Sequence, residues 1–101
     1  MKLIIVTTAE EFKSDVLKLF KNAQIENLST SPIGGYKNKA NLLSASNWFS
    51  GLDSGTKSCM FFSFTDDEHI DILFRLVEEF NSTLETNNPV KAVVVPIERF
   101  I

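Results

Sequence analysis

The feature that most constrains the fold is a pattern that occurs twice along the chain. An apolar run is followed by a threonine, by a glutamate three residues later and by an amphipathic helical stripe. The apolar runs cover residues 3–6 and 58–65, and such runs are typical of strands buried in a sheet. The threonine–glutamate spacing is that of a capping box, so each helix is expected to begin at its threonine. The two pairs are Thr8 with Glu11 and Thr65 with Glu68.

Each predicted helix carries a single apolar stripe, because its apolar side chains recur at steps of three or four residues. The first helix is expected to end near Asn22, and residues 87–89 (Asn-Asn-Pro) end the second repeat. The first stripe consists of Phe12, Val16, Leu19, Phe20 and Ala23, and the second of Ile70, Leu73, Leu76, Val77, Phe80 and Leu84.

Two further strands are predicted, over residues 25–33 and 91–97. Pro32 cannot donate a hydrogen bond to a neighbouring strand, so the first of them is placed at an edge or a bulge. Within residues 58–65 the side chains alternate between two faces. Met60, Phe62 and Phe64 share one face, and Cys59, Phe61 and Ser63 share the other.

This order of elements predicts an α+β fold, a ferredoxin-like βαββαβ sandwich with a four-stranded antiparallel sheet and both helices on one face. Residues 1–101 are expected to form a single domain, which is small enough to gain stability from oligomerisation. An uncovered sheet face carrying residues such as Ile4 or Phe61 would be a large apolar patch, which monomers rarely expose. Self-association through the sheets is therefore expected.

Composition and charge exclude several classes of function. The net charge of −3 and the pI near 5.0 argue against a nucleic-acid partner, because such proteins carry a basic excess. The only cysteine, Cys59, cannot form an internal disulfide, so a reducing, cytoplasmic location is expected. The N-terminal apolar run is far too short to span a bilayer, so no direct membrane insertion is expected.

The sequence contains no set of nucleophile, base and orienting residue, so no enzyme activity and no catalytic residue are expected. His69 lies among acidic residues at the start of the second helix. The favoured interpretation is a solvated histidine beside carboxylates that complement the helix dipole, and the alternative is a metal or acid–base site. Cys59 is interpreted as a small core residue.

The segment 34–57 is longer than most connections within a domain and is therefore a candidate functional element. It opens with Gly34 and Gly35, which permit a sharp turn or the close approach of a ligand. Its apolar residues are expected to dock on a partner protein or to pack against this subunit or a neighbouring one. These residues are Leu42, Leu43, Trp48, Phe49 and Leu52.

Residues 91–98, with the sequence KAVVVPIE, resemble the last core strand of the PII signal-transduction family, the nitrogen regulatory proteins. The order of elements agrees with that family. The resemblance implies a homotrimer assembled through the sheets, with a long loop between the second and third strands. It also implies ligand binding in clefts between subunits, and here residues 87–90 stand where the family has a glycine-rich turn. The ligand-binding residues carried over are Gly34, Gly35, Tyr36, Lys37 and Lys91.

The function implied is that of a non-enzymatic regulator that binds a small effector, a nucleotide or another small molecule, and signals to a transporter or a metabolic enzyme through the loop. The alternative is a trimeric metal-binding protein of the related CutA family, which also ends its core with a strand of this kind. In that case Cys59, His69 or Asp53 would be metal ligands. A metal ion is the less favoured ligand.

Overall fold

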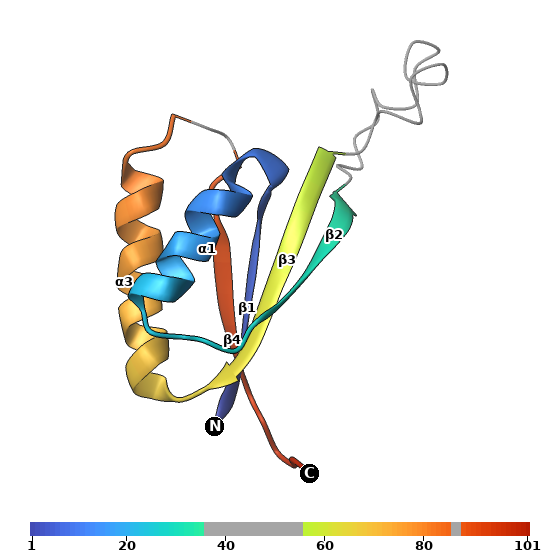
Figure 1. Cartoon of the computed structure of the whole chain (residues 1–101), viewed down its shortest axis with the longest axis vertical. Helices are drawn as coiled ribbons and strands as arrows, with labels where there is room; N and C mark the ends of the chain where they lie inside the picture. Colours follow the sequence, from blue (N-terminus) through green and yellow to red (C-terminus); the bar gives the residue numbers. More distant parts are fainter. Residues whose placement is uncertain (36–55, 86–87) are drawn as a thin grey trace.

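The computed structural model describes residues 1–35, 56–85 and 88–101 (Figure 1). The chain begins with a strand, a short 3-10 helix and a longer helix, continues with two strands and a second long helix, and ends with a fourth strand. The elements are β1 (Lys2–Ala9), the 3-10 helix η1 (Glu10–Phe12), α1 (Lys13–Asn22), β2 (Ser29–Gly35), β3 (Thr56–Thr65), α3 (Asp67–Ser82) and β4 (Lys91–Pro96).

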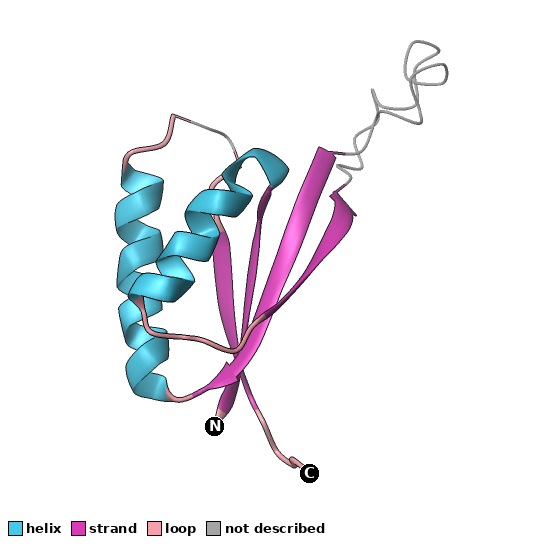
Figure 2. Cartoon of the chain, in the orientation of Figure 1, coloured by secondary structure: helices cyan, strands magenta, loops and turns pink. Residues whose placement is uncertain are grey.

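The four strands form one sheet in the order β2-β3-β1-β4, and every neighbouring pair is antiparallel. Helices α1 and α3 lie side by side on the same face of this sheet (Figure 2). The prediction of an α+β fold with four antiparallel strands and two helices is confirmed, and the arrangement is compatible with the ferredoxin-like sandwich. Strands β2 and β4 form the two edges.

The core lies between the sheet and the helices. Ile4 of β1, Phe61 of β3, Phe20 of α1 and Leu73 of α3 are all 0% exposed. The rings of Phe20 and Phe61 pack with their centroids 5.7 Å apart. The expectation that Ile4 and Phe61 lie on an uncovered face is therefore wrong. These two side chains face the helices, and their alternate neighbours in each strand face the other way.

Both helices begin later than their threonines. Strand β1 continues through Thr8 to Ala9, because Thr8 follows Ile4 and Val6 on the face that the helices cover. Its hydroxyl is buried and has no hydrogen-bond partner among the described residues, so it caps no helix. At the second helix the cap is Asp66, whose carboxylate accepts the His69 backbone N–H at 3.0 Å. An aspartate is as good an N-cap as a threonine, so the position nearer the helix is used.

Strand β2 pairs with β3 as far as Gly35, two residues beyond the predicted end of this strand at residue 33. Gly34 and Gly35 pair with residues 57 and 56 of β3, so they continue the strand and do not form a turn. Their lack of a side chain does not prevent regular strand pairing. The connection between the two strands is thereby shortened to residues 36–55, which lie outside the described residues. Pro32 lies in an edge strand, as predicted.

Candidate functional site

The sheet face that points away from the helices carries exposed apolar side chains. Val93 is 54% exposed, Phe64 47% and Val95 41%. The strand register places Leu3 between Phe64 and Val95. In the next row of the same face it places Ile5 between Phe62 and Val93, which are also apolar. We call this surface the open face. Its described large apolar side chains are Leu3, Ile5, Ile33, Met60, Phe62, Phe64, Val93 and Val95.

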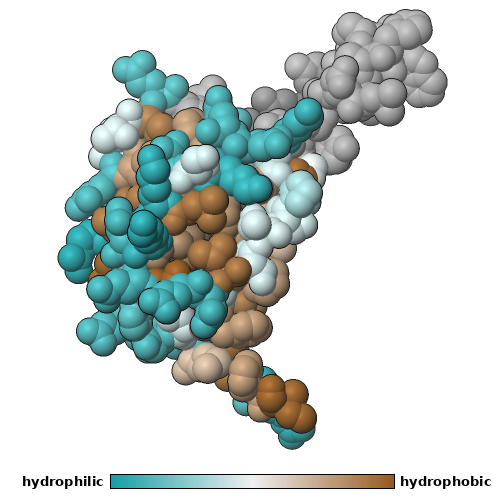
Figure 3. Space-filling model, viewed as in Figure 1, coloured by the Kyte–Doolittle hydropathy of each residue, from teal (hydrophilic) through white to brown (hydrophobic). Residues whose placement is uncertain are grey.

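Aromatic rings extend the open face at the end of the sheet where β3 finishes. Phe62 and Phe64 meet edge to face at 6.5 Å, and Phe64 meets Phe100 of the C-terminal segment at 5.7 Å. Phe100 remains 64% exposed. In Figure 3 hydrophilic residues dominate the surface over the helices, and hydrophobic colour lies in the middle of the view and at the lower end, where the C-terminal segment emerges. Apolar side chains thus continue from the end of the sheet into the C-terminal segment.

The residues predicted to bind a ligand are separated by the width of the sheet. Lys91 is exposed at the start of β4, and its backbone pairs with Thr7 of β1. Gly34 and Gly35 lie at the end of β2, the opposite edge. With about 4.8 Å between neighbouring strands, the two edges are about 14 Å apart. One chain therefore does not bring these residues into contact, and Tyr36 and Lys37 lie outside the described residues.

The predicted partner-binding residues also fall outside the described part of the chain. All of them belong to the connection between β2 and β3, whose described ends are Gly35 and Thr56. Because these two residues pair across the ladder, the connection leaves and re-enters the sheet at adjacent points. The residues concerned are Leu42, Leu43, Trp48, Phe49 and Leu52.

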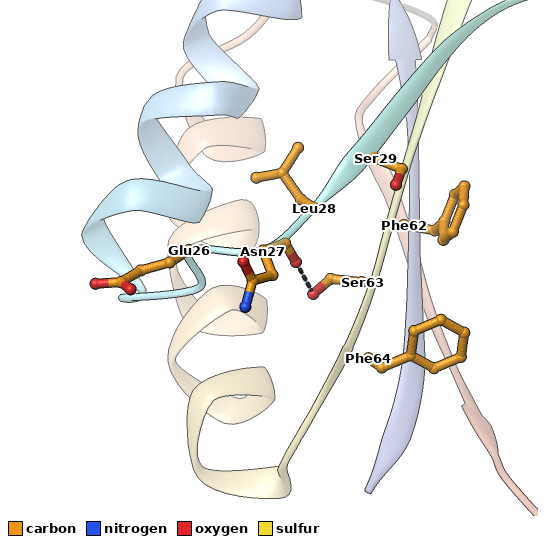
Figure 4. A pocket seen from close by; sticks show the side chains of 7 residues that line it. All are labelled: Glu26, Asn27, Leu28, Ser29, Phe62, Ser63 and Phe64. Carbon is orange, nitrogen blue, oxygen red and sulfur yellow. Dashed lines mark hydrogen bonds between the residues drawn. The ribbon is translucent and has the colours of Figure 1, made fainter. Parts of the chain in front are cut away.

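A hollow of about 420 Å³ lies where β2 begins and β3 ends (Figure 4). Its lining combines two aromatic rings on one side of β3 with polar groups from the segment that leads into β2. The rings of Phe62 and Phe64 project from the same side of the strand, while Ser63 points to the other side. The lining residues are Glu26, Asn27, Leu28, Ser29, Phe62, Ser63 and Phe64.

Residues 26–28, which form one wall of this hollow, lie in a segment that is fixed by hydrogen bonds at the end of α1 and at Asn27. At the end of α1 the Ile25 N–H donates to the Phe20 carbonyl and the Gln24 N–H to that of Lys21, each at 3.0 Å. This is a Schellman motif, and Gln24 adopts the left-handed conformation that it requires, with φ 62°. Further on, the buried Ser63 hydroxyl donates to the Asn27 carbonyl. The hollow is therefore bounded by fixed backbone.

Sequence patterns did not indicate this hollow. The sequence predicts a strand over residues 25–33, whereas β2 begins only at Ser29. Alternation predicts that Phe62 and Phe64 share a face, but their proximity to Asn27 depends on the pairing of β2 with β3. The available local signal is the pair of polar residues at 26 and 27, between the first helix and β2, which is typical of a connection.

The residues considered as metal ligands are far apart. Cys59 lies on the helix-covered face of β3, 3% exposed, and burial raises the pKa of its thiol despite the nearby Lys13. It is the small core residue that was predicted. His69 lies beyond the other end of β3, where its Nδ1 is 2.6 Å from Asp66 Oδ1. The six residue-to-residue steps from Cys59 to Thr65 alone span about 20 Å, so one chain cannot bring the thiol and the imidazole to one ion.

Among the described residues there is no group of three or more His, Cys, Asp or Glu side chains arranged to hold a metal ion. Asp53 is outside this part of the chain. No helix within the described ranges is long and apolar enough to cross a membrane. Comparison of the chain with protein-family models and with curated protein sequences finds no match.

Proposed function

We propose that this chain is a non-enzymatic, PII-like regulatory protein of the cytoplasm, which assembles as a homotrimer, binds a small effector between subunits and signals to a transporter or a metabolic enzyme. The observation that carries the proposal is the open face. Three of its side chains are between 41% and 54% exposed, and they adjoin further apolar residues in the register of three strands. A contiguous apolar surface of this kind marks an interaction site.

A second copy of the chain is the partner that fits the open face best. Lys91 is the only charged side chain on this face among the described strand residues, so a partner rich in charge would find no complement there. An apolar surface is complementary to a copy of itself, and cyclic symmetry allows each subunit to bury its face against its neighbours. The trimeric state follows from the resemblance to the PII family.

The effector is proposed to bind where the hollow of one subunit approaches Lys91 of a neighbour. A volume of about 420 Å³ falls within the roughly 300–1,000 Å³ of small-molecule sites. The Phe62 and Phe64 rings provide apolar surface for a flat ring on one side of β3, and Asn27, on the other side, provides an acceptor for N–H groups elsewhere on the same molecule. An anionic group on the same molecule would be complementary to Lys91.

The connection formed by residues 36–55 is proposed to contact the target, with Trp48 and Phe49 as anchors. It starts from Gly35 and returns at Thr56, which are paired in the sheet. An effector that favours one conformation of this connection changes the affinity of the protein for its target. By linkage, the target then changes the affinity of the protein for the effector by the same factor.

The assembly is tested by light scattering after size exclusion, comparing the wild type with Val93→Lys and with Leu17→Lys. Leu17 is an exposed apolar residue of α1, 38% exposed, and serves as a matched control on the other side of the molecule. We expect a trimer for the wild type and for Leu17→Lys, and a monomer for Val93→Lys. A wild type that stays monomeric at high concentration would contradict the proposal, as would a trimeric Val93→Lys.

The effector site is tested by titrating ATP and AMP while following the fluorescence of Trp48, the only tryptophan. Asn27→Ala and Lys91→Ala should weaken binding without changing the mass of the assembly. Asn27→Ala is suitable because its backbone carbonyl, the partner of Ser63, is retained. Binding that is unchanged in both variants would place the effector elsewhere.

A further inference from the structure

The connection into β4 is held by the side chain of Asn81, near the end of α3. Its Nδ2 donates to the Val90 carbonyl at 2.8 Å, and its Oδ1 accepts the Val90 N–H at 2.9 Å. The carboxamide thus binds both backbone groups of one residue, as a neighbouring strand would. The Val90 side chain is 3% exposed and belongs to the core, so the residue is fixed from both sides. We call this pair of hydrogen bonds the Asn81 clamp.

The clamp determines the position of Lys91. Val90 is the residue directly before Lys91, and Lys91 itself is the first residue of β4, paired with Thr7. The backbone that carries the Lys91 side chain is therefore held on one side by helix α3 and on the other by the sheet. Asn81 acts on any ligand of Lys91 through this backbone, as a positioning residue.

The clamp also removes a backbone donor. Polyphosphates are commonly bound by several consecutive backbone N–H groups in a turn or at a helix N-terminus. Here Pro89 has no N–H and that of Val90 is already donated to Asn81. Two consecutive positions before Lys91 therefore offer no donor to an anion. Positive charge on the open face is equally limited, because Lys91 is its single cation among the described strand residues.

We infer that Asn81 positions Lys91 for an effector that carries a single anionic group, a carboxylate or a monophosphate, bound by the lysine ammonium without a hydrogen bond from the backbone of Pro89 or Val90. The inference rests on the proposed function and names the chemical class of its effector. A second and third phosphate would add negative charge that is neutralised neither by the backbone of Pro89 and Val90 nor by a second cation among the described strand residues of this face.

The first test compares AMP with ATP on the wild-type protein by calorimetry. We expect dissociation constants that agree within a factor of about three, since one exposed ammonium discriminates weakly between anions of different charge. A preference for ATP of tenfold or more would overturn the inference, because it would require donors that the clamp excludes.

The second test replaces Asn81, with Asn22→Ala at the exposed end of α1 as the control. Asn81→Ala frees the Val90 N–H, so we expect weaker AMP binding and a ratio of ATP to AMP affinity that rises several-fold. Asn81→Asp keeps an acceptor for that N–H, so the ratio should stay at its wild-type value. A ratio that is the same in wild type, Asn81→Ala and Asn81→Asp would assign the clamp a merely structural role and overturn the inference.

A third measurement separates this inference from the proposed function. Orthophosphate needs no ring in the hollow, so it is titrated while the Lys91 side-chain and Val90 amide resonances are followed by NMR. Phosphate should shift the Lys91 signals and leave the Val90 amide in place. If it does so while neither nucleotide binds, the proposed effector site fails and the inference stands. An unshifted Lys91, or a Val90 amide that shifts with it, would overturn the inference.

Discussion

Phe61 and Phe64 provide a matched pair of substitutions, because they lie three residues apart in β3 on opposite faces of the sheet. Truncating a buried phenylalanine to alanine lowers the free energy of unfolding by about 3–5 kcal/mol. Phe61 is 0% exposed, so Phe61→Ala should have the full effect. Phe64 is 47% exposed, so only about half of its side chain is buried, and Phe64→Ala should lower the free energy of unfolding by about 2 kcal/mol. The difference of about 2 kcal/mol corresponds to roughly 10 °C in Tm for a chain of this size.

The assay is urea denaturation followed by circular dichroism over a series of protein concentrations. At concentrations where the chain is monomeric, Phe61→Ala should be the more destabilising by this margin. At concentrations where a second copy covers the open face, the cost of Phe64→Ala should rise toward that of Phe61→Ala. Equal costs at the lowest concentration would refute the reasoning, because the open face would then be covered within a single chain.

Three further substitutions test local features of the fold by the same measurement of unfolding free energy. Thr8→Val removes a buried hydroxyl without a partner among the described residues and should stabilise the chain by about 1 kcal/mol, so a loss of stability would reveal a bond to that hydroxyl. Gln24→Gly should stabilise it by up to about 1 kcal/mol, because glycine adopts the left-handed conformation of the Schellman motif without steric cost, and an unchanged or lower stability would contradict this. The His69 backbone N–H holds the pKa of Asp66 below its ordinary value, so the contribution of Asp66 is present at neutral pH and lost on acidification through that lowered pKa. Asp66→Ala should be less stable than the wild type at pH 7 and approach it in acid, and a pH-independent difference would exclude this linkage.

The order of strands and helices could be predicted from the sequence, because apolar runs and helical stripes are properties of neighbouring residues. Alternation also sorted the residues of β3 into two faces correctly. It could not identify the covered face, since both Phe61 and Phe64 are large and apolar. The structure places Phe61 toward the helices between the smaller Cys59 and Ser63, and the Phe61 ring packs against that of Phe20.

The remaining errors arose where tertiary pairing decides the structure. A threonine with a glutamate three residues later occurs in strands as well as at helix ends, and β1 extends through Thr8 because the helices cover that side chain. Gly34 and Gly35 have no local signal for a strand, and their pairing partners lie more than 20 residues further along the chain. The hollow likewise joins residues 26–29 to residues 62–64, which no local pattern connects.

The strand register has a practical consequence for work with fusion proteins. Lys2 pairs with both Thr65 and Pro96, so the two termini emerge at the same end of the sheet, beside Phe64 and Phe100 (Figure 1). A purification tag at either terminus would thus be attached beside the exposed rings of Phe64 and Phe100, next to the surface where a second copy is proposed to bind. Masses and affinities should be measured after proteolytic removal of the tag, and a fluorescent reporter is better attached to an exposed side chain on the outer surface of α3, such as Glu78.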